Sequence, residues 1–310
     1  MISFLLFIFI FIEYNVENLF DTMHDQGKQD EEFLPNSTYH WSHYRYWKKL
    51  DHISQAIVAC GDTTLGHLPD MAVLTEVEND SVMRDLTRRS LLRTARYDYV
   101  MTDSPDQRGI DIALLYSPFS FRLLNYHAIR INPPVGHRPT RDILYASGII
   151  MNGDTLHIIA VHAPSRAGGE ALSRPYRLLV AKKISNIVDS INGASQSPLI
   201  AVAGDFNDYS TDTSLKFLAG HGLTEASEKA VGSHGARGTY RFHGEWGSLD
   251  HILCNTRLVK KFRSCHINDT PFLLEEDKKY GGVKPHRTFL GPRYLGGFSD
   301  HLPLVSIFSF

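Results

Sequence analysis

Several apolar runs of this sequence end in polar residues of the types that catalytic sites use. The run Leu199–Ala203 is followed by Gly204, and Asp205 and Asn207 then stand two positions apart. An ionised carboxylate in an apolar setting needs a partner. A buried strand that delivers a carboxylate and a carboxamide together therefore predicts a site for a cation and an anionic substrate.

The same pattern recurs along the chain, each time at or near an apolar run. The other residues that show it are Asn15, Glu17, Glu76, Glu78, His162, Asp250, Asp300 and His301. Pockets commonly form where strands end. We therefore expect these strand ends to converge on one site.

Most of these residues also have an ordinary structural explanation. Asn15 is typical of a turn, and acidic residues such as Glu76 suit the start of a helix. Asp205 and Asn207 are compatible with an Asx-turn or a helix cap.

His162 could simply close a strand, and Asp300 could cap a turn. Asp250 is harder to explain in this way, because a carboxylate inside an apolar strand needs a donor. One shared site is more economical than six separate explanations.

Short strands and amphipathic helices must position these residues. Two hairpins are predicted, MNGDTLHIIAVH with an Asn-Gly turn and TYRFHGEWGSLDHIL with a turn near Gly244 to Gly247. Helical periodicity is found at 44–60, 79–92, 169–191 and near 212–219, and Pro175 predicts that the regular part of the third helix begins there. Strand candidates lie near 8–14, 70–75, 97–101, 110–116, 120–131, 142–151, 155–162, 198–203, 238–243, 248–254 and 302–309. This mixture favours an α/β sandwich of two packed, mainly antiparallel or mixed sheets flanked by helices.

The composition is that of an ordinary globular protein, with 43% hydrophobic and 21% charged residues. The formal net charge of −2 excludes a strongly basic nucleic-acid binder, although a local basic groove remains compatible with it. The three cysteines lack metal-type spacing, so we expect free thiols and a reducing compartment. No H-E-x-x-H motif of a zinc peptidase is present.

The first twelve residues form an apolar segment that leads into the first strand, and 13–310 are expected to form a single domain. No Lys or Arg precedes the apolar run and no small-residue cleavage site follows it. We favour a buried first strand, and a remnant of a signal sequence is the alternative. The expected location is the cytoplasm, or the periplasm or exterior if the segment belongs to a signal.

The combination of motifs resembles the endonuclease/exonuclease/phosphatase superfamily, and looks like a bacterial member of this DNase I-like group. The resemblance rests on YNVENLF (14–20), LTEVEN (74–79), RGIDIALLY (108–116), VHAPSR (161–166), GDFND (204–208), SLDHIL (248–253) and SDHLPL (299–304), which occur in family order across nearly the whole chain. It implies a four-layer α/β sandwich and hydrolysis of phosphate esters that depends on Mg²⁺ or Mn²⁺.

The resemblance also implies which residues bind the metal. Glu76 matches the principal metal-binding glutamate, and Asn15 matches the asparagine beside it. Asp300 is a candidate for a second metal or for a supporting role. Mg²⁺ prefers oxygen ligands and takes only one or two protein carboxylates, which agrees with this set.

The remaining motif residues match the groups that act on the phosphate. Asp205 matches the residue that positions or deprotonates the attacking water, and Asn207 can hydrogen-bond the phosphate. His301 matches a histidine that contacts the scissile phosphate, and Asp250 matches the carboxylate that orients it. His162 matches a phosphate-contacting histidine of the DNase I, sphingomyelinase and 5-phosphatase branches, which abasic-site endonucleases usually lack.

Several basic residues have two interpretations. Arg108 and Arg166 are candidates for substrate binding or plain surface arginines. The Gly- and Lys/Arg-rich segment 276–298 is long enough to be a functional or mobile loop. The arginines at 84, 88, 89, 93 and 96 suit a binding rim less well than the solvated face of a helix.

We expect a metal-dependent hydrolase of phosphate esters, above all a phosphodiesterase or nuclease. Two alternatives stay open: a phosphomonoesterase or lipid phosphodiesterase of the inositol phosphatase or sphingomyelinase type, and an inactive module that binds a phosphorylated ligand. The expected partner is the substrate itself, which is a nucleic acid, a nucleotide or a phospholipid headgroup. No obligate protein partner is evident, and we expect a monomer.

Overall fold

A computed structural model describes residues 7–62, 64–133, 135–166 and 168–310. Two six-stranded sheets form its centre. The first has the order β13-β18-β1-β2-β4-β3, with β1 Ile8–Leu19, β2 Met71–Val77, β3 Asp98–Met101, β4 Asp111–Tyr116, β13 Phe262–Ile267 and β18 Leu304–Ser309. The second has the order β5-β6-β7-β8-β12-β9, with β5 Phe121–Ile129, β6 Ile143–Ile150, β7 Thr155–His162, β8 Leu199–Asp205, β9 Leu223–Glu225 and β12 Asp250–Asn255.

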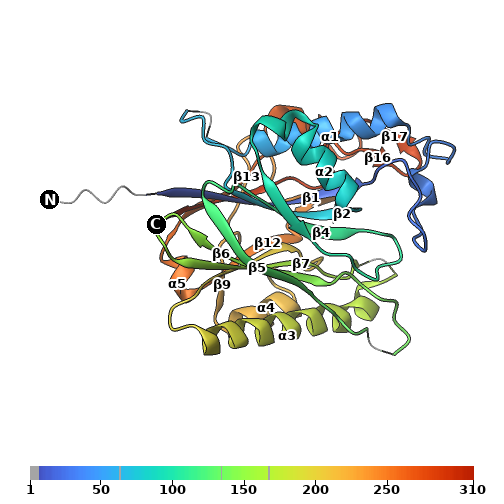
Figure 1. Ribbon diagram of the computed structural model, residues 1–310. Helices are drawn as coiled ribbons and strands as arrows, with labels where there is room; N and C mark the ends of the chain where they lie inside the picture. Colours follow the sequence, from blue (N-terminus) through green and yellow to red (C-terminus); the bar gives the residue numbers. More distant parts are fainter. Residues whose placement is uncertain (1–6, 63, 134, 167) are drawn as a thin grey trace.

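The two sheets pack face to face, and helices cover their outer faces (Figure 1). Helices α1 (His43–Val58) and α2 (Asp80–Arg88) lie over the first sheet, and α3 (Glu170–Ala194) and α4 (Thr213–Gly220) lie over the second. Within the sheets, β1–β2 and β7–β8 are parallel and the other pairs are antiparallel. The predicted α/β sandwich of two mixed sheets is confirmed.

Strand β8 shows how the sequence builds these layers. Leu199, Ala201 and Ala203 face the core between the sheets, whereas Ile200 and Val202 pack under α3 and α4. Alternate side chains of a strand point to opposite faces, so a strand covered on both faces reads as a continuous apolar run.

Helix α3 begins at Glu170, close to the predicted start at 169, but the expectation that its regular part begins at Pro175 was wrong, because the proline lies inside the helix. Proline cannot donate the hydrogen bond that would reach back four residues to Ala171. An ion pair between Arg174 and Glu170 (2.6 Å) spans this first part of the helix. This ion pair between residues one turn apart stabilises the first turn of the helix, where the proline removes a hydrogen bond.

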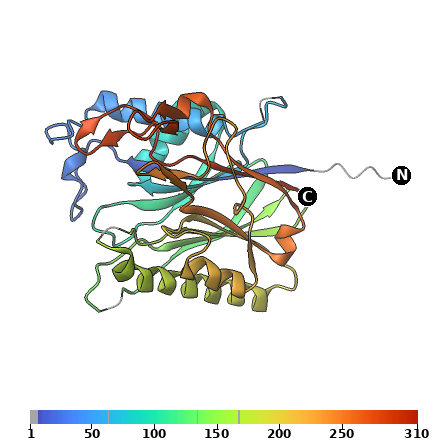
Figure 2. The ribbon, with the colours of Figure 1, turned by 180° about the vertical axis from the view of Figure 1, so that it is seen from behind.

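The C-terminal third holds elements that the sequence patterns did not predict, namely β13 and the short helix α5 (Thr256–Val259). The segment 276–298 is folded into small hairpins, with β14 Leu274–Glu276 paired to β15 Val283–Pro285 and β16 Phe289–Leu290 paired to β17 Arg293–Tyr294. It lies beside α1 (Figure 2), where Lys49 donates to the Thr288 hydroxyl at 2.6 Å.

The predicted hairpin at 238–254 is partly correct. Strands β10 (Tyr240–Phe242) and β11 (Glu245–Gly247) pair around a turn at His243 and Gly244, but the following β12 joins the second sheet. The other predicted hairpin is confirmed as β6 and β7.

All three cysteines are free, as predicted, and Cys254 is buried in the core. Residues 1–6 of the apolar N-terminal segment lie outside the described residues. Among the helices that the structure describes, none has the length and apolarity to cross a membrane.

Candidate active site

The register of three neighbouring strands places three site residues at one level. His162 on β7 pairs with Asp205 on β8 in the parallel ladder, and Asp205 pairs with Asp250 on β12 in the antiparallel one. All three side chains are buried. The strand ends therefore converge as the sequence predicted, and the hydrogen-bond ladder fixes their relative positions.

Gly204 permits the close contact between β7 and β8 just before Asp205. Its φ is +146°, and a Cβ placed there would lie 1.8 Å from the Val161 carbonyl oxygen. Only glycine fits this conformation and this space. The glycine thus keeps His162 and Asp205 side by side.

Bulges in β1 and β2 set the direction of the Glu76 side chain, which the sequence analysis predicted to be a metal ligand. The β1–β2 ladder shifts register between Asn15 and Leu19, and Glu76 is the residue left over on β2. Glu17, Asn18 and Glu76 have φ values of 49°, 53° and 66°. Such left-handed conformations in non-glycine residues are strained and tend to occur at functional sites.

The Glu76 carboxylate is held at the pocket by this arrangement. Its Oε2 accepts a hydrogen bond from the Asn18 backbone N–H at 2.9 Å. Its Oε1 lies 3.9 Å from His162 Nε2, and Arg108 approaches Oε2 at 3.7 Å.

His301 and Asp250 form a buried pair. The His301 Nδ1 lies 2.7 Å from Asp250 Oδ2, and the Thr239 hydroxyl also donates to this oxygen. Burial by itself lowers the pKa of His301, but the charge and hydrogen bond of Asp250, with Asp300 and Asp205, raise that pKa well above its usual value. His301 is therefore a cation near neutral pH.

His162, in contrast to His301, is uncharged. Burial lowers the pKa of this histidine well below its usual value, and Arg141 and Arg108 lower it further. Its Nε2 lies 3.6 Å from Asp205 Oδ2. The same pocket therefore contains a neutral and a cationic imidazole.

Asp205 lies between the two histidines. Asn15 Nδ2 donates to its Oδ2 at 3.1 Å, and the Asn207 backbone N–H donates to its Oδ1 at 2.8 Å. Burial and the charge of Asp250 raise the pKa of Asp205 to about 7. A carboxylate whose pKa is near the working pH suits general-base catalysis.

Glu13 lies beneath this cluster on β1, and the sequence analysis did not identify it. It is fully buried, and neither carboxylate oxygen has a hydrogen-bond partner among the described residues. Burial, Asp250 and Asp205 raise the pKa of Glu13 well above its usual value. Burial and the neighbouring carboxylates thus favour the protonated, uncharged form of Glu13.

Asp300 belongs to a second network that reaches into the segment 276–298. Arg287 bonds Asp300 at 3.0 Å and Glu17 at 3.3 Å, and the Thr288 backbone N–H donates to Glu17 at 2.6 Å. Burial and the charge of Asp300 raise the pKa of Glu17 to about 7, although Lys49 and Arg287 oppose this rise. The segment therefore contributes a cation that holds Asp300 beside His301.

These residues surround one pocket of about 570 Å³, and of the residues expected to converge there, Glu17, Glu78 and Asp250 do not line it. Asp250 lies behind His301. The lining residues are Asn15, Asn18, Glu76, Arg108, His162, Ser165, Arg166, Asp205, Asn207, Tyr209, Tyr240, Phe242, Leu249, Asp300 and His301.

Comparisons with known proteins agree with this geometry. The sequence model of the Endonuclease/Exonuclease/phosphatase family matches residues 10–309. The chain belongs to the endonuclease/exonuclease/phosphatase family. A comparison with curated proteins finds no match.

Solved structures show the same fold as this family member. A family protein from Bacteroides thetaiotaomicron is 15% identical with a TM-score of 0.63, and the match covers 99% of each chain. A mannosyl-6-phosphatase from the same organism is 15% identical with a TM-score of 0.62, covering 97% of this chain and 99% of the other. The human Nocturnin catalytic domain, with a bound sulfate anion, is 18% identical with a TM-score of 0.57, covering 98% and 94%.

The donor set of this family member fits a divalent cation. Asn15, Glu76 and Asp300 all line the pocket and carry side-chain oxygens, and hard cations such as Mg²⁺ prefer such ligands. Asp205, Asp250 and His301 also bring one ligand atom each within 4.8 Å of one another. The hydrogen bond between His301 and Asp250 already explains why these two residues lie close together. The residues Asn15, Glu76 and Asp300 are therefore the better candidates for the metal site.

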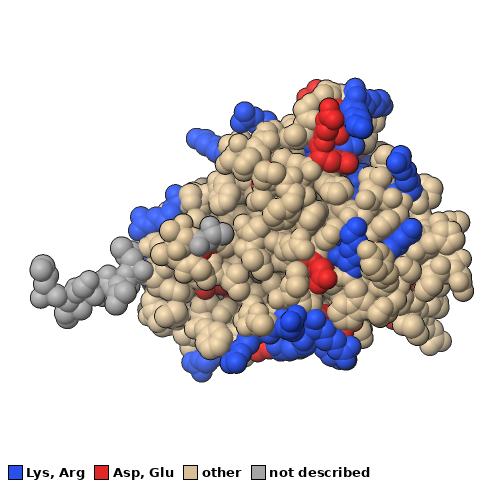
Figure 3. Space-filling model, turned by 90° about the horizontal axis from the view of Figure 1, so that it is seen from above, with Lys and Arg blue, Asp and Glu red and all other residues tan. Residues whose placement is uncertain are grey.

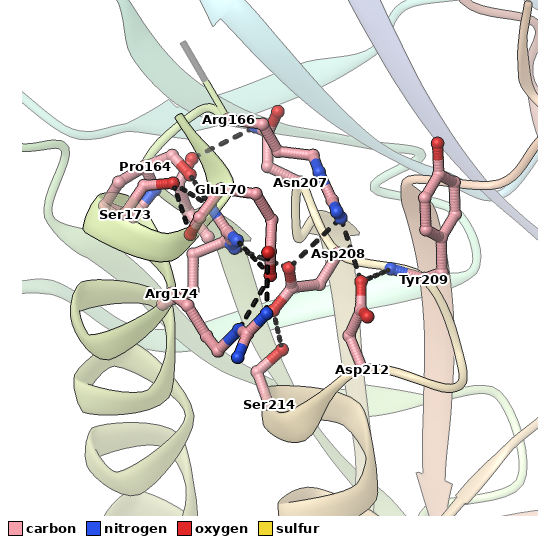
Figure 4. Close-up of polar contacts among 12 residues, drawn as sticks. Pro164, Arg166, Glu170, Ser173, Arg174, Asn207, Asp208, Tyr209, Asp212 and Ser214 are labelled. Carbon is pink, nitrogen blue, oxygen red and sulfur yellow. Dashed lines mark hydrogen bonds and ion pairs between the residues drawn. The ribbon is translucent and has the colours of Figure 1, made fainter. Parts of the chain in front are cut away.

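Arg166 lines the pocket, but acidic side chains hold its guanidinium. It bonds Asp212 at 2.8 Å and lies 3.5 Å from Asp208, and its guanidinium stacks on Tyr209 (Figure 4). Two carboxylates therefore share its charge. Arg108 reaches Asn18 Oδ1 at 2.5 Å, and its half-exposed side chain is the more accessible cation of the pocket.

Sequence reasoning missed the aromatic side of the pocket. The Tyr240 ring lies 4.9 Å from the His301 ring, and Phe242 continues the row at 6.5 Å from Tyr240. Tyr240 and Phe242 are two positions apart on a predicted strand, so the sequence indicated that they share one face of it. No local sequence pattern indicated that this face borders the active site.

Proposed function

We propose that this protein is a Mg²⁺- or Mn²⁺-dependent phosphodiesterase, and that its activity is closest to that of a nuclease. The observation that carries the proposal is the position of Asp205 between the neutral His162 and the His301–Asp250 pair in one pocket. A base, a neutral donor and a held cation around one point suit the attack of water on a phosphate ester.

The roles follow from the chemistry of each group. Asp205 accepts the proton of the attacking water. His301, held as a cation by Asp250, donates from Nε2 to a phosphoryl oxygen as negative charge develops there. A cation held by Asn15, Glu76 and Asp300 would neutralise the phosphate and favour ionised Asp205.

Two features favour a diester over a monoester. Arg108 lies on one side of the pocket, and Tyr240 and Phe242 lie on another. Ester groups on both sides of the phosphorus can therefore contact protein. A mannosyl-6-phosphatase shares the fold, so monoesters belong in the same test.

The test measures hydrolysis of bis(p-nitrophenyl) phosphate, p-nitrophenyl phosphate, DNA, RNA and sphingomyelin, with EDTA and after adding back Mg²⁺ or Mn²⁺. We expect diester cleavage that EDTA abolishes and either metal restores. Full activity in a metal-stripped sample, or cleavage of the monoester alone, would contradict the proposal.

Glu76→Gln and Glu78→Gln form a matched pair for the metal assignment. Both glutamates end β2 or follow it, but only Glu76 lines the pocket. Burial raises the pKa of Glu78 to about 9, so its replacement changes little charge at neutral pH. We expect Glu76→Gln to lose metal-dependent activity and Glu78→Gln to keep it.

A further inference from the structure

The end of the sandwich opposite the pocket carries exposed apolar side chains. Phe119 is 72% exposed and Met151 is 64% exposed, and both line a surface pocket with Phe7. Met151 lies in the turn before β7, and His162 ends that strand. The turn and the active site are thus at opposite ends of the same strand. Exposed apolar side chains that gather in this way mark an interaction site.

Basic side chains surround the same end. Lys261 accepts a backbone hydrogen bond from Ser309, which pairs with Ile8 at the start of β1. Lys260 and Arg263 flank it and are exposed. Figure 3 shows Lys and Arg side chains at this edge of the molecule, on the left of the view.

These cations are available for an external anion. Across the described residues, no carboxylate lies within ion-pair distance of Lys260, Lys261 or Arg263. The whole chain has a formal net charge of −2, so any attraction to an anionic surface must come from local cations such as these and not from the overall charge. The six residues before Phe7 are Met-Ile-Ser-Phe-Leu-Leu, without a charged side chain.

We propose that this end of the molecule docks on an anionic lipid bilayer and that the active-site pocket faces away from the membrane. Apolar side chains that enter the interface, combined with lysines and arginines that attract anionic headgroups, are the features of peripheral membrane binding. The docking surface consists of Phe7, Phe119, Met151, Lys260, Lys261 and Arg263.

The orientation narrows the substrate class, and this step rests on the proposed phosphodiesterase function. Strand β1 runs from Ile8 at the docking surface to Asn15 in the pocket. At ~3.3 Å per residue this separates the two by on the order of 20 Å. A headgroup that stays in the bilayer is out of reach, so the substrate is a water-soluble phosphodiester.

Vesicle sedimentation with the full chain tests the docking. We compare vesicles of phosphatidylcholine alone with vesicles that also contain phosphatidylglycerol, and expect stronger binding to the second. Lys260→Gln with Arg263→Gln should weaken that binding by roughly 30-fold, because each cation contributes about a fivefold factor near an anionic surface. Phe119→Ser with Met151→Ser should also weaken binding.

The matched control is Lys182→Gln with Lys216→Gln, which removes the same charge from exposed positions on α3 and α4. It should bind like the wild type, and melting curves should show that all variants fold. Equal losses in the control and the Lys260/Arg263 variant, or no binding by the wild type, would overturn the proposal.

A separate measurement, which does not depend on catalytic activity, tests how the protein is oriented on the bilayer. A fluorophore attached through Phe119→Cys should be quenched by spin-labelled lipid, and one attached through Phe242→Cys at the pocket should not. The reverse pattern would overturn the orientation. If no phosphodiester is cleaved at all, the proposed function fails while both lipid measurements keep their meaning.

Discussion

The two histidines of the pocket are equally buried, but they differ in charge. His162 lies near Arg108 and Arg141, and burial together with these cations keeps it neutral. His301 lies against Asp250, with Asp300 and Asp205 nearby, and these carboxylates keep it protonated although burial opposes this. Because both rings are buried, the difference in charge between them follows from their neighbours.

This difference divides the work of the pocket. We call the side of the pocket formed by His162 and Arg108 the neutral-histidine wall, and the side formed by His301, with Asp250 behind it, the cationic-histidine wall. A phosphate between them meets a hydrogen-bonding ring on one side and a fixed positive charge on the other. Asp205 lies between the walls.

Replacing Asp205, which lies between the two walls, should lower kcat more than replacing either histidine. Asp205→Asn keeps the shape of the side chain and removes the base, and general-base catalysis is worth ~10² to 10⁴ in rate. We expect kcat to fall by about that factor while inorganic phosphate still binds. A variant with nearly wild-type kcat would exclude Asp205 as the base.

The cationic-histidine wall should show the next largest loss. His301→Ala should lower kcat by roughly 10² to 10³, the usual cost of removing a donor to developing negative charge. If Asp250 acts only by holding His301, then Asp250→Ala and the double variant should lose about as much as His301→Ala. Losses that simply multiply would show that the two residues act independently.

The neutral-histidine wall should be less sensitive. A hydrogen bond to a charged group contributes ~1.5–3 kcal/mol, so His162→Asn should lower kcat/KM by about 10- to 100-fold. Steady-state kinetics on bis(p-nitrophenyl) phosphate measures this loss. A loss as large as that of His301→Ala would mean that the walls contribute alike.

The smallest effect concerns stability and pH, measured without divalent metal. The pKa of His301 is raised on folding, so its contribution to stability is complete below ~6.5 and is lost as pH rises through the folded value. The pKa of His162 is lowered, so the protein loses stability relative to a His162→Gln variant as pH falls below ~6.5. Each slope is limited to ~1.4 kcal/mol per pH unit for one proton.

Urea unfolding of the wild type, His301→Gln and His162→Gln from acid to alkaline pH checks this prediction. The stability difference between wild type and His301→Gln should shrink with rising pH, and that for His162→Gln should grow in favour of the wild type. Slopes of the same sign would remove the contrast between the walls.

The sequence predicted those residues of the candidate site that lie at the ends of strands. Each of Asn15, Glu76, His162 and Asp205 follows or ends an apolar run, and strand register brings such positions together. The charge difference between the two histidines could not be predicted, because it depends on long-range neighbours such as Arg141. The metal and substrate roles of the site residues stay predictions.

The layers of the fold were predictable, but the parts that depend on distant packing were not. The apolar run of β8 reveals a strand covered on both faces. Tyr240 reaches the pocket from the short β10–β11 hairpin, and Arg287 reaches Asp300 from the loop between β15 and β16; both positions depend on tertiary contacts, with His301 and with Glu17 and Asp300.

The tight glycine before Asp205 has a consequence for how this enzyme can diversify. Any side chain at Gly204 would meet the Val161 carbonyl and push β7 and β8 apart, which would separate Asp205 from His162. We therefore expect that substitutions which keep this pairing can be made at other borders of the pocket, such as the β10–β11 hairpin that carries Phe242. Those positions offer a way to alter substrate preference without moving His162 relative to Asp205.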